Sequence, residues 1–135
     1  MFKIQIMGLF SKLFSSSVEQ KEEKSLPWLD LNTINQLQTI KDKSTAKTQV
    51  IFKHSTRCGI SRMVIKQFTE DFVFSENQLD LYYLDLIAYR EVSNAVANTF
   101  NVVHESPQLL VIKNSIVVKH ESHGGINDLD LNRFI

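Results

Sequence analysis

The sequence predicts a single α/β domain in which a mixed central sheet is covered by helices on both faces. Strand-like and helix-like segments alternate along most of the chain, which favours strands joined by helices that pack on the sheet. Two apolar runs then follow with only Asn114 and Ser115 between them. A two-residue connection between such runs predicts an antiparallel hairpin.

The size and composition of the chain are typical of one globular domain. It has 135 residues, of which 43% are hydrophobic and 22% charged. Fifteen basic residues balance fifteen acidic ones, so the net charge favours neither nucleic acid nor an anionic membrane as a partner. A single cysteine excludes an internal disulfide and a Cys-rich metal site. We expect a monomer that binds no nucleic acid.

The first 24 residues are predicted to form a flexible N-terminal arm, and residues 25–135 the folded domain. The arm has three consecutive serines followed by a run of charged residues, and such a segment has nothing to pack. Met7 is an alternative translation start. The apolar runs near the N-terminus are too short for a signal peptide or a membrane span. We therefore expect a cytoplasmic protein without stable membrane association.

The predicted elements follow from the spacing of apolar residues. Strands are expected over residues 49–54, 79–86, 108–112 and 116–120. Helices are expected from Asn32 or Thr33 to about residue 40, over residues 60–74 and 89–100, and from Asn127 or Asp128 onward. The apolar faces of the first three helices are Leu31, Ile34, Leu37 and Ile40; Met63, Val64, Gln67, Phe68 and Phe72; and Val92, Ala95, Val96 and Phe100.

Cys58 is the candidate nucleophile because it lies in the turn between a central strand and the helix that follows it. The first N–H groups of a helix lack backbone partners, and the helix dipole adds positive potential at that end. Both favour the thiolate. We expect this stabilisation from the helix start at Gly59, Ile60 and Ser61, with further positive charge from Arg57.

The fourth position of the Cys58-Gly59-Ile60-Ser61 motif defines the expected chemistry. A second cysteine there would close a disulfide, whereas the Ser61 hydroxyl can only hydrogen-bond the sulfur. A mixed disulfide on Cys58 must therefore be resolved by an external thiol, which is a monothiol mechanism. The alternative is an inert core cysteine. The polar neighbours of Cys58 favour an exposed turn instead.

Ser106 and Pro107 form the second candidate element, at the start of the first hairpin strand. Proline cannot donate to a sheet ladder, so it fits the first residue of a strand. This position is compatible with a cis bond, which would let the Ser106 backbone face Cys58 and pair with substrate. The alternative is an ordinary trans proline, which the residues alone favour.

The four histidines do not predict a metal site. His54, His104, His120 and His123 lack the close spacing typical of metal ligands. The adjacent carboxylates Glu70 and Asp71 are better explained as a solvated helix face. We expect neither a metal nor a bound cofactor.

Residues 52–61, together with Ser106-Pro107, resemble the YtxJ family of monothiol bacilliredoxins, which have a thioredoxin-like fold. The similarity extends from Trp28 to Ile135. It implies that Cys58 accepts bacillithiol, the co-substrate, from S-thiolated client proteins, and that a second bacillithiol restores the free cysteine. It also implies that Pro107 is a cis-proline, and that substrate contacts Thr56, His54, Ser106 and Pro107.

Two departures qualify this resemblance. The family commonly has proline after the cysteine, where this chain has Gly59, and glycine loosens a helix start. Phe52 stands where many thioredoxins keep a buried acid, so a proton shuttle must involve His54, water or the incoming thiol.

Two other interpretations remain open at this point. The domain could be a non-catalytic binding or redox-sensor module in which Cys58 is only a modification site. A glutathione-type thiol-transferase would differ from the first interpretation only in its low-molecular-weight thiol.

Overall fold

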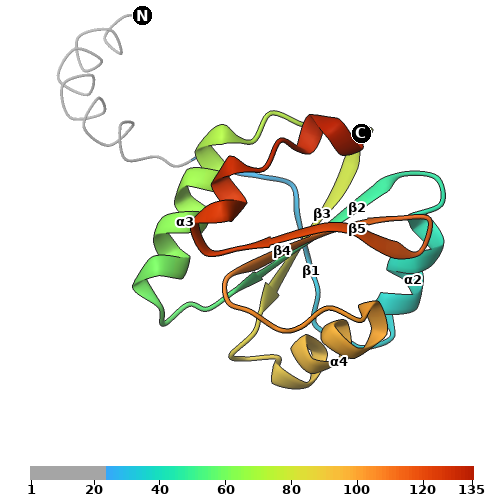
Figure 1. The fold of residues 1–135 in the computed structure, drawn as a ribbon, viewed down its shortest axis with the longest axis horizontal. Helices are drawn as coiled ribbons and strands as arrows, with labels where there is room; N and C mark the ends of the chain where they lie inside the picture. The colour runs from blue at the N-terminus through green and yellow to red at the C-terminus, as the bar shows by residue number, and fades with distance from the viewer. Residues whose placement is uncertain (1–23) are drawn as a thin grey trace, which may run out of the picture.

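The computed structural model describes residues 24–135, which form an α/β fold around one five-stranded sheet (Figure 1). The predicted N-terminal arm lies outside the described residues except for Lys24. The strands occur in the spatial order β1-β3-β2-β4-β5. Their bounds are β1 (Trp28–Asp30), β2 (Thr48–His54), β3 (Leu79–Asp85), β4 (Gln108–Lys113) and β5 (Ile116–Ser122).

The sheet is mixed, as the sequence predicted. β3 runs parallel to β1 and β2, whereas β4 runs antiparallel to β2 and to β5. One face carries α2 (Gln36–Lys43) and α4 (Arg90–Phe100). The other face carries α3 (Gly59–Asp71) and the 3-10 segment His123–Asp128, followed by a second one at Leu131–Phe134 (Figure 1).

β2 is the central strand, and all seven of its residues are buried. Successive side chains of a strand point to opposite faces. Val50 and Phe52 therefore pack in the core under α3, while Ile51 packs in the core under α2 and α4. Burial on both faces explains why three consecutive residues at the centre of this strand, Val50 to Phe52, are apolar.

The predicted hairpin is confirmed. Asn114 and Ser115 connect β4 to β5 with positive φ angles of 53° and 72°, the backbone that a tight two-residue hairpin turn requires. The turn is fixed to the end of α2, because the Ser115 amide donates to the Ser44 hydroxyl at 2.7 Å and the Asn114 amide to the Ser44 carbonyl at 2.9 Å.

The first part of the domain differs from the prediction. The short edge strand β1 was not predicted, because three residues are too few to show an alternating pattern. α2 begins at Gln36 rather than at residue 33. Ile34 consequently precedes the helix and is 49% exposed instead of belonging to the apolar face. The Gln36 side chain accepts hydrogen bonds from the amides of Asn32 and Thr33.

Two further predictions about helices were wrong. In α3 the buried stripe is Val64, Phe68 and the following Phe72, whereas Met63 is 71% exposed and Gln67 is also exposed. The C-terminal segment forms two 3-10 turns rather than a helix. Although these turns are short, they still bury Ile126 and Leu131 in the core under α3.

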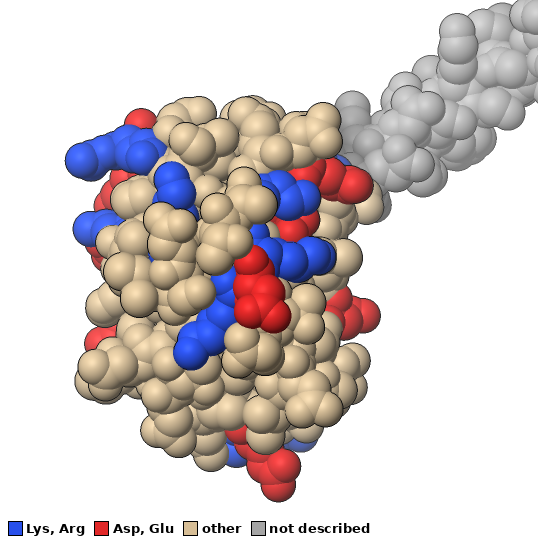
Figure 2. All heavy atoms as spheres, turned by 90° about the vertical axis from the view of Figure 1, so that its right-hand side faces the viewer, with Lys and Arg blue, Asp and Glu red and all other residues tan. Residues whose placement is uncertain are grey.

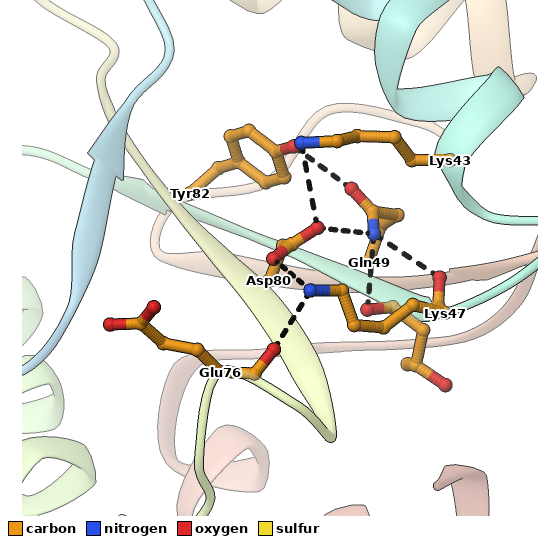
Figure 3. A network of polar contacts seen from close by, with 7 residues as sticks. Lys43, Lys47, Gln49, Glu76, Asp80 and Tyr82 are labelled. Carbon is orange, nitrogen blue, oxygen red and sulfur yellow. Dashed lines mark hydrogen bonds and ion pairs between the residues drawn. The ribbon is translucent and has the colours of Figure 1, made fainter.

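A polar network closes the end of the sheet away from the α3 N-terminus (Figure 3). Asp80 of β3 binds Lys47 at 2.9 Å and Gln49 at 2.8 Å, and Lys43 lies 3.8 Å away. The Tyr82 hydroxyl donates to Gln49. Burial opposes ionisation of Asp80, but the hydrogen bonds and charges of its partners outweigh it and lower its pKa.

Figure 2 shows basic and acidic side chains interspersed on the visible face. No helix within residues 24–135 is long and apolar enough to cross a membrane.

Asp80→Asn should destabilise the fold by about 1–2 kcal/mol at pH 7, because Lys47 loses its ion pair and Lys47 is only partly exposed. The pKa of Asp80 is lowered in the fold, so its contribution exists above the ordinary value of about 3.9 and is lost as the pH falls through the folded value. Urea unfolding at pH 7 and pH 3 measures this. Exposed Asp128→Asn is the control. An equal effect of Asp80→Asn at both pH values would contradict the assignment.

Candidate active site around Cys58

Cys58 caps α3 at its N-terminus. Its backbone is extended, with φ −102° and ψ 124°, and its carbonyl accepts the first hydrogen bond of the helix from the Arg62 amide at 3.0 Å. Its own amide donates to the Ser55 carbonyl at 3.2 Å and closes the turn after β2. The residue is partly exposed. The sulfur is thus attached one residue before the helix. The first amides of the helix, which have no backbone acceptors, follow directly.

The surroundings of Cys58 are open and positively charged. Thr56, Arg57, Gly59 and Ile60 are exposed around it. Arg62 folds back over the turn, and its guanidinium donates to the Thr56 carbonyl at 3.3 Å. No acidic residue occurs in the first turn of α3. An anion at the sulfur would therefore meet the helix dipole and two nearby guanidinium groups.

Ser61 is fully buried in the first turn of α3. Its hydroxyl accepts a hydrogen bond from the Ser55 amide at 3.1 Å and lies 2.8 Å from the His54 Nδ1. Among residues 24–135, no hydrogen bond joins this hydroxyl to the Cys58 sulfur. Ser61 consequently fixes the helix start to the end of β2, a different role from the sulfur contact that the motif suggested.

The predicted contact of His54 with substrate requires a correction. His54 is buried, and its Nδ1 faces Ser61. Burial lowers the pKa of His54; the charge of Asp85 raises it and that of Arg62 lowers it further. The imidazole is therefore mainly neutral at pH 7. The structure places it behind the cysteine turn, where it supports Ser61 rather than meeting an incoming molecule.

Ser106 and Pro107 lie at the same end of the sheet as Cys58. Their peptide bond is cis, as the resemblance to the bacilliredoxin family implied. Antiparallel pairing sets Gln108 of β4 opposite Lys53 of β2, so Pro107 comes beside the end of β2, from which the Cys58 turn departs. Pro107 is buried and Ser106 is half-buried. The Pro107 carbonyl accepts from the His123 amide at 3.1 Å.

Two residues near the site were missed by sequence reasoning. Lys53 is fully buried in β2, and its Nζ lies 3.1 Å from the His104 Nδ1. Gln108, also fully buried, bonds the backbone before Ser106. The available signal was a lysine that directly follows three apolar strand residues, Val50, Ile51 and Phe52. The part of the chain that the structure describes has no group of three or more His, Cys, Asp or Glu residues that could hold a metal.

This combination of a mixed sheet, a cysteine at a strand-to-helix junction and a cis-proline beside it defines a thioredoxin-fold protein. Known structures support this class. A solved structure with a thioredoxin fold shares 32% identity over 78% of this chain and 91% of its own, with a TM-score of 0.66. Thioredoxins of Schistosoma mansoni and Malassezia sympodialis both have TM-scores of 0.59.

These two thioredoxins share the fold alone. The first is 18% identical over 80% of this chain and 95% of its own, and the second 14% over 84% and 88%. The family is defined more closely, since residues 29–131 match the family described as monothiol bacilliredoxin BrxC. The chain belongs to this family, which agrees with the resemblance seen in the sequence and indicates a thiol redox function.

Replacing Ser61 tests its place in the site. Ser61→Ala should destabilise the fold by about 1–3 kcal/mol, because the buried Ser55 amide and the His54 ring lose their partner. Ser93→Ala is a matched control: Ser93 is equally buried, but its hydroxyl has no hydrogen-bond partner in the described structure. Urea denaturation compares the two. Equal stability changes would argue against a supporting role for Ser61.

Proposed function

We propose that this protein is a monothiol thiol–disulfide oxidoreductase that removes bacillithiol from S-thiolated proteins in the cytoplasm. One observation carries the proposal: the single cysteine of the chain is partly exposed at the start of α3, and a buried serine occupies the position of a resolving cysteine. Membership of the bacilliredoxin family supports bacillithiol as the thiol that is exchanged.

The reaction has two exchange steps. In the first, the Cys58 thiolate attacks the bacillithiol sulfur of the modified client, a new disulfide joins Cys58 to bacillithiol, and the client thiolate leaves. In the second, the thiolate of a free bacillithiol attacks that sulfur, oxidised bacillithiol forms and the Cys58 thiolate leaves. Overall, the client sulfur is reduced from a disulfide to a thiol and one free bacillithiol is oxidised into the product disulfide. One disulfide is consumed and one is formed, so the electrons balance. Each departing thiolate takes a proton from solvent according to its acidity.

The residues around Cys58 have distinct proposed roles. The amides of Gly59, Ile60 and Ser61, with the charge of Arg57, stabilise the Cys58 thiolate as nucleophile and as leaving group. A thiolate that leaves easily is needed in the second step, since the intermediate must be released to an external thiol.

Substrate is proposed to bind between the cysteine turn and the start of β4. Thr56 is exposed beside Cys58, and its backbone and hydroxyl offer polar contacts. Ser106 and Pro107 form the facing edge, where backbone groups of Ser106 would pair with the incoming molecule. No bound cofactor is needed in this scheme, because bacillithiol arrives and leaves as a co-substrate.

The test is the reduction of a client protein carrying a bacillithiol adduct. In the presence of free bacillithiol, the wild-type protein should release the adduct rapidly, whereas Cys58→Ala should lower the rate by more than about 100-fold because no other thiol remains. Intact-protein mass spectrometry follows the client and the Cys58 adduct. Glu70→Gln, an exposed change near the far end of α3, should retain full activity.

Two outcomes would redirect the assignment. Equal release with glutathione instead of bacillithiol would indicate a thiol-transferase without preference for bacillithiol. A wild-type protein that gains an adduct on Cys58 but never turns over would instead indicate a redox sensor, and the proposed enzymatic function would be wrong.

A further inference from the structure

The loop over residues 101–107, which leads from α4 into β4, lies above two buried polar side chains. Lys53 of β2 and Gln108 of β4 face each other as a cross-strand pair, and both are fully buried. Ile51 and Leu110, two residues away on the same strands, pack in the core under α2 and α4. By strand alternation Lys53 and Gln108 point to that same face. They therefore lie on the opposite side of the sheet from His54.

This pair contacts three consecutive residues of the loop. The Gln108 Nε2 donates to the Val103 carbonyl at 2.9 Å, and its Oε1 accepts from the Glu105 amide at 3.4 Å. The Lys53 Nζ lies 3.1 Å from the His104 Nδ1. An ammonium group can only donate, so Nδ1 is the acceptor and the imidazole proton lies on Nε2. One cross-strand pair thus fixes the loop immediately before Ser106.

Stability alone does not account for a lysine in this position. Burial lowers the pKa of Lys53 to about 8, so the group still carries its charge at pH 7 at a cost in solvation. An apolar side chain of similar length would fill the space without that cost. The feature that Lys53 adds is a directed bond to His104, in a loop that is otherwise exposed at Val103, His104 and Glu105.

We propose that Lys53 is a positioning residue for substrate: through His104, and together with Gln108, it holds the loop over residues 103–106 so that the Ser106 backbone is ready to receive the incoming disulfide. This inference rests on the proposed function, because the Ser106 edge matters only if substrate binds beside Cys58. Lys53 acts through the loop and does not itself touch the reacting sulfurs.

The contact should also depend on pH. The charged groups facing His104 are Lys53 from β2, Arg90 from the start of α4 and Glu105 from the loop itself. Burial and the charges of Lys53 and Arg90 lower the pKa of His104, and Glu105 raises it. His104 is consequently neutral and an acceptor at pH 7. Protonation of His104 requires a pH below its lowered pKa, which lies under the ordinary value of about 6.5. Once protonated, Nδ1 can no longer accept, and the ring repels Lys53.

Three variants of the full chain test this arrangement. Lys53→Met keeps the side-chain length without the donor, His104→Leu removes the acceptor, and His104→Gln retains an acceptor that does not titrate. With the bacillithiol-modified client, Lys53→Met and His104→Leu should raise KM about tenfold, the effect of one lost hydrogen bond. We expect kcat within about twofold of wild type and an unchanged rate of Cys58 alkylation.

The pH profile distinguishes positioning from a purely structural role. The wild-type KM should rise only as the pH falls below about 6.5, because the pKa of His104 is lowered in the fold, whereas the KM of His104→Gln should stay near the wild-type value at pH 7 and remain flat as the pH falls. Lys53→Met should unfold at the same or a higher urea concentration than wild type. The proposal would be overturned if Lys53→Met had the same KM as wild type at pH 7. It would also be overturned if the variant lost kcat and stability together.

A second readout does not depend on turnover. Hydrogen–deuterium exchange of the peptide covering residues 101–107 should be about tenfold faster in Lys53→Met than in wild type or in Asp128→Asn, because the loop is less restrained. Unchanged exchange would contradict the role of Lys53. If the wild type releases no bacillithiol, the proposed function fails alone. In that case the role of Lys53 is decided by two comparisons of Lys53→Met with wild type: the hydrogen–deuterium exchange rate of residues 101–107, and the rate at which Cys58 reacts with a small-molecule disulfide.

Discussion

The site depends on one constraint, the abrupt change from a fully buried strand to a helix at Cys58. β2 is buried on both faces up to His54, and α3 begins only five residues later at Gly59. The first amides of that helix have no backbone acceptors. They follow directly after Cys58 and so lie at the end of the helix that carries the sulfur. Phe52 of β2 packs against Phe68 of α3, with ring centroids 5.1 Å apart. This contact fixes the strand and the helix in that relation, and the thiol chemistry follows from it.

Two neighbouring side chains at the end of β2 support the two halves of the site from opposite faces. His54 reaches Ser61 and steadies the turn that carries Cys58. Lys53 reaches His104 and steadies the loop that leads into Pro107. Both side chains are buried, and burial lowers the pKa of each basic group below its ordinary value. Their roles differ because adjacent residues of a strand point to opposite faces of the sheet.

Much of this arrangement could be predicted from local sequence, because turn chemistry and long apolar patterns act locally. The hairpin at Asn114-Ser115 and the strand before Cys58 are examples. Features that depend on tertiary contacts could not be predicted in this way. The Ser61 hydroxyl contacts His54 and the Ser55 amide rather than the Cys58 sulfur, which depends on how α3 packs against the end of β2. Lys53 looked like a strand-end lysine until β4 and the loop with His104 covered it.

The most direct test of the central claim compares the rate at which Cys58 reacts with a small-molecule disulfide at pH 7 in the folded protein and in the same protein unfolded by urea. If the start of α3 activates the sulfur, the folded protein should react about threefold faster than the unfolded chain. An equal or slower rate in the folded protein would show that the helix start does not activate Cys58.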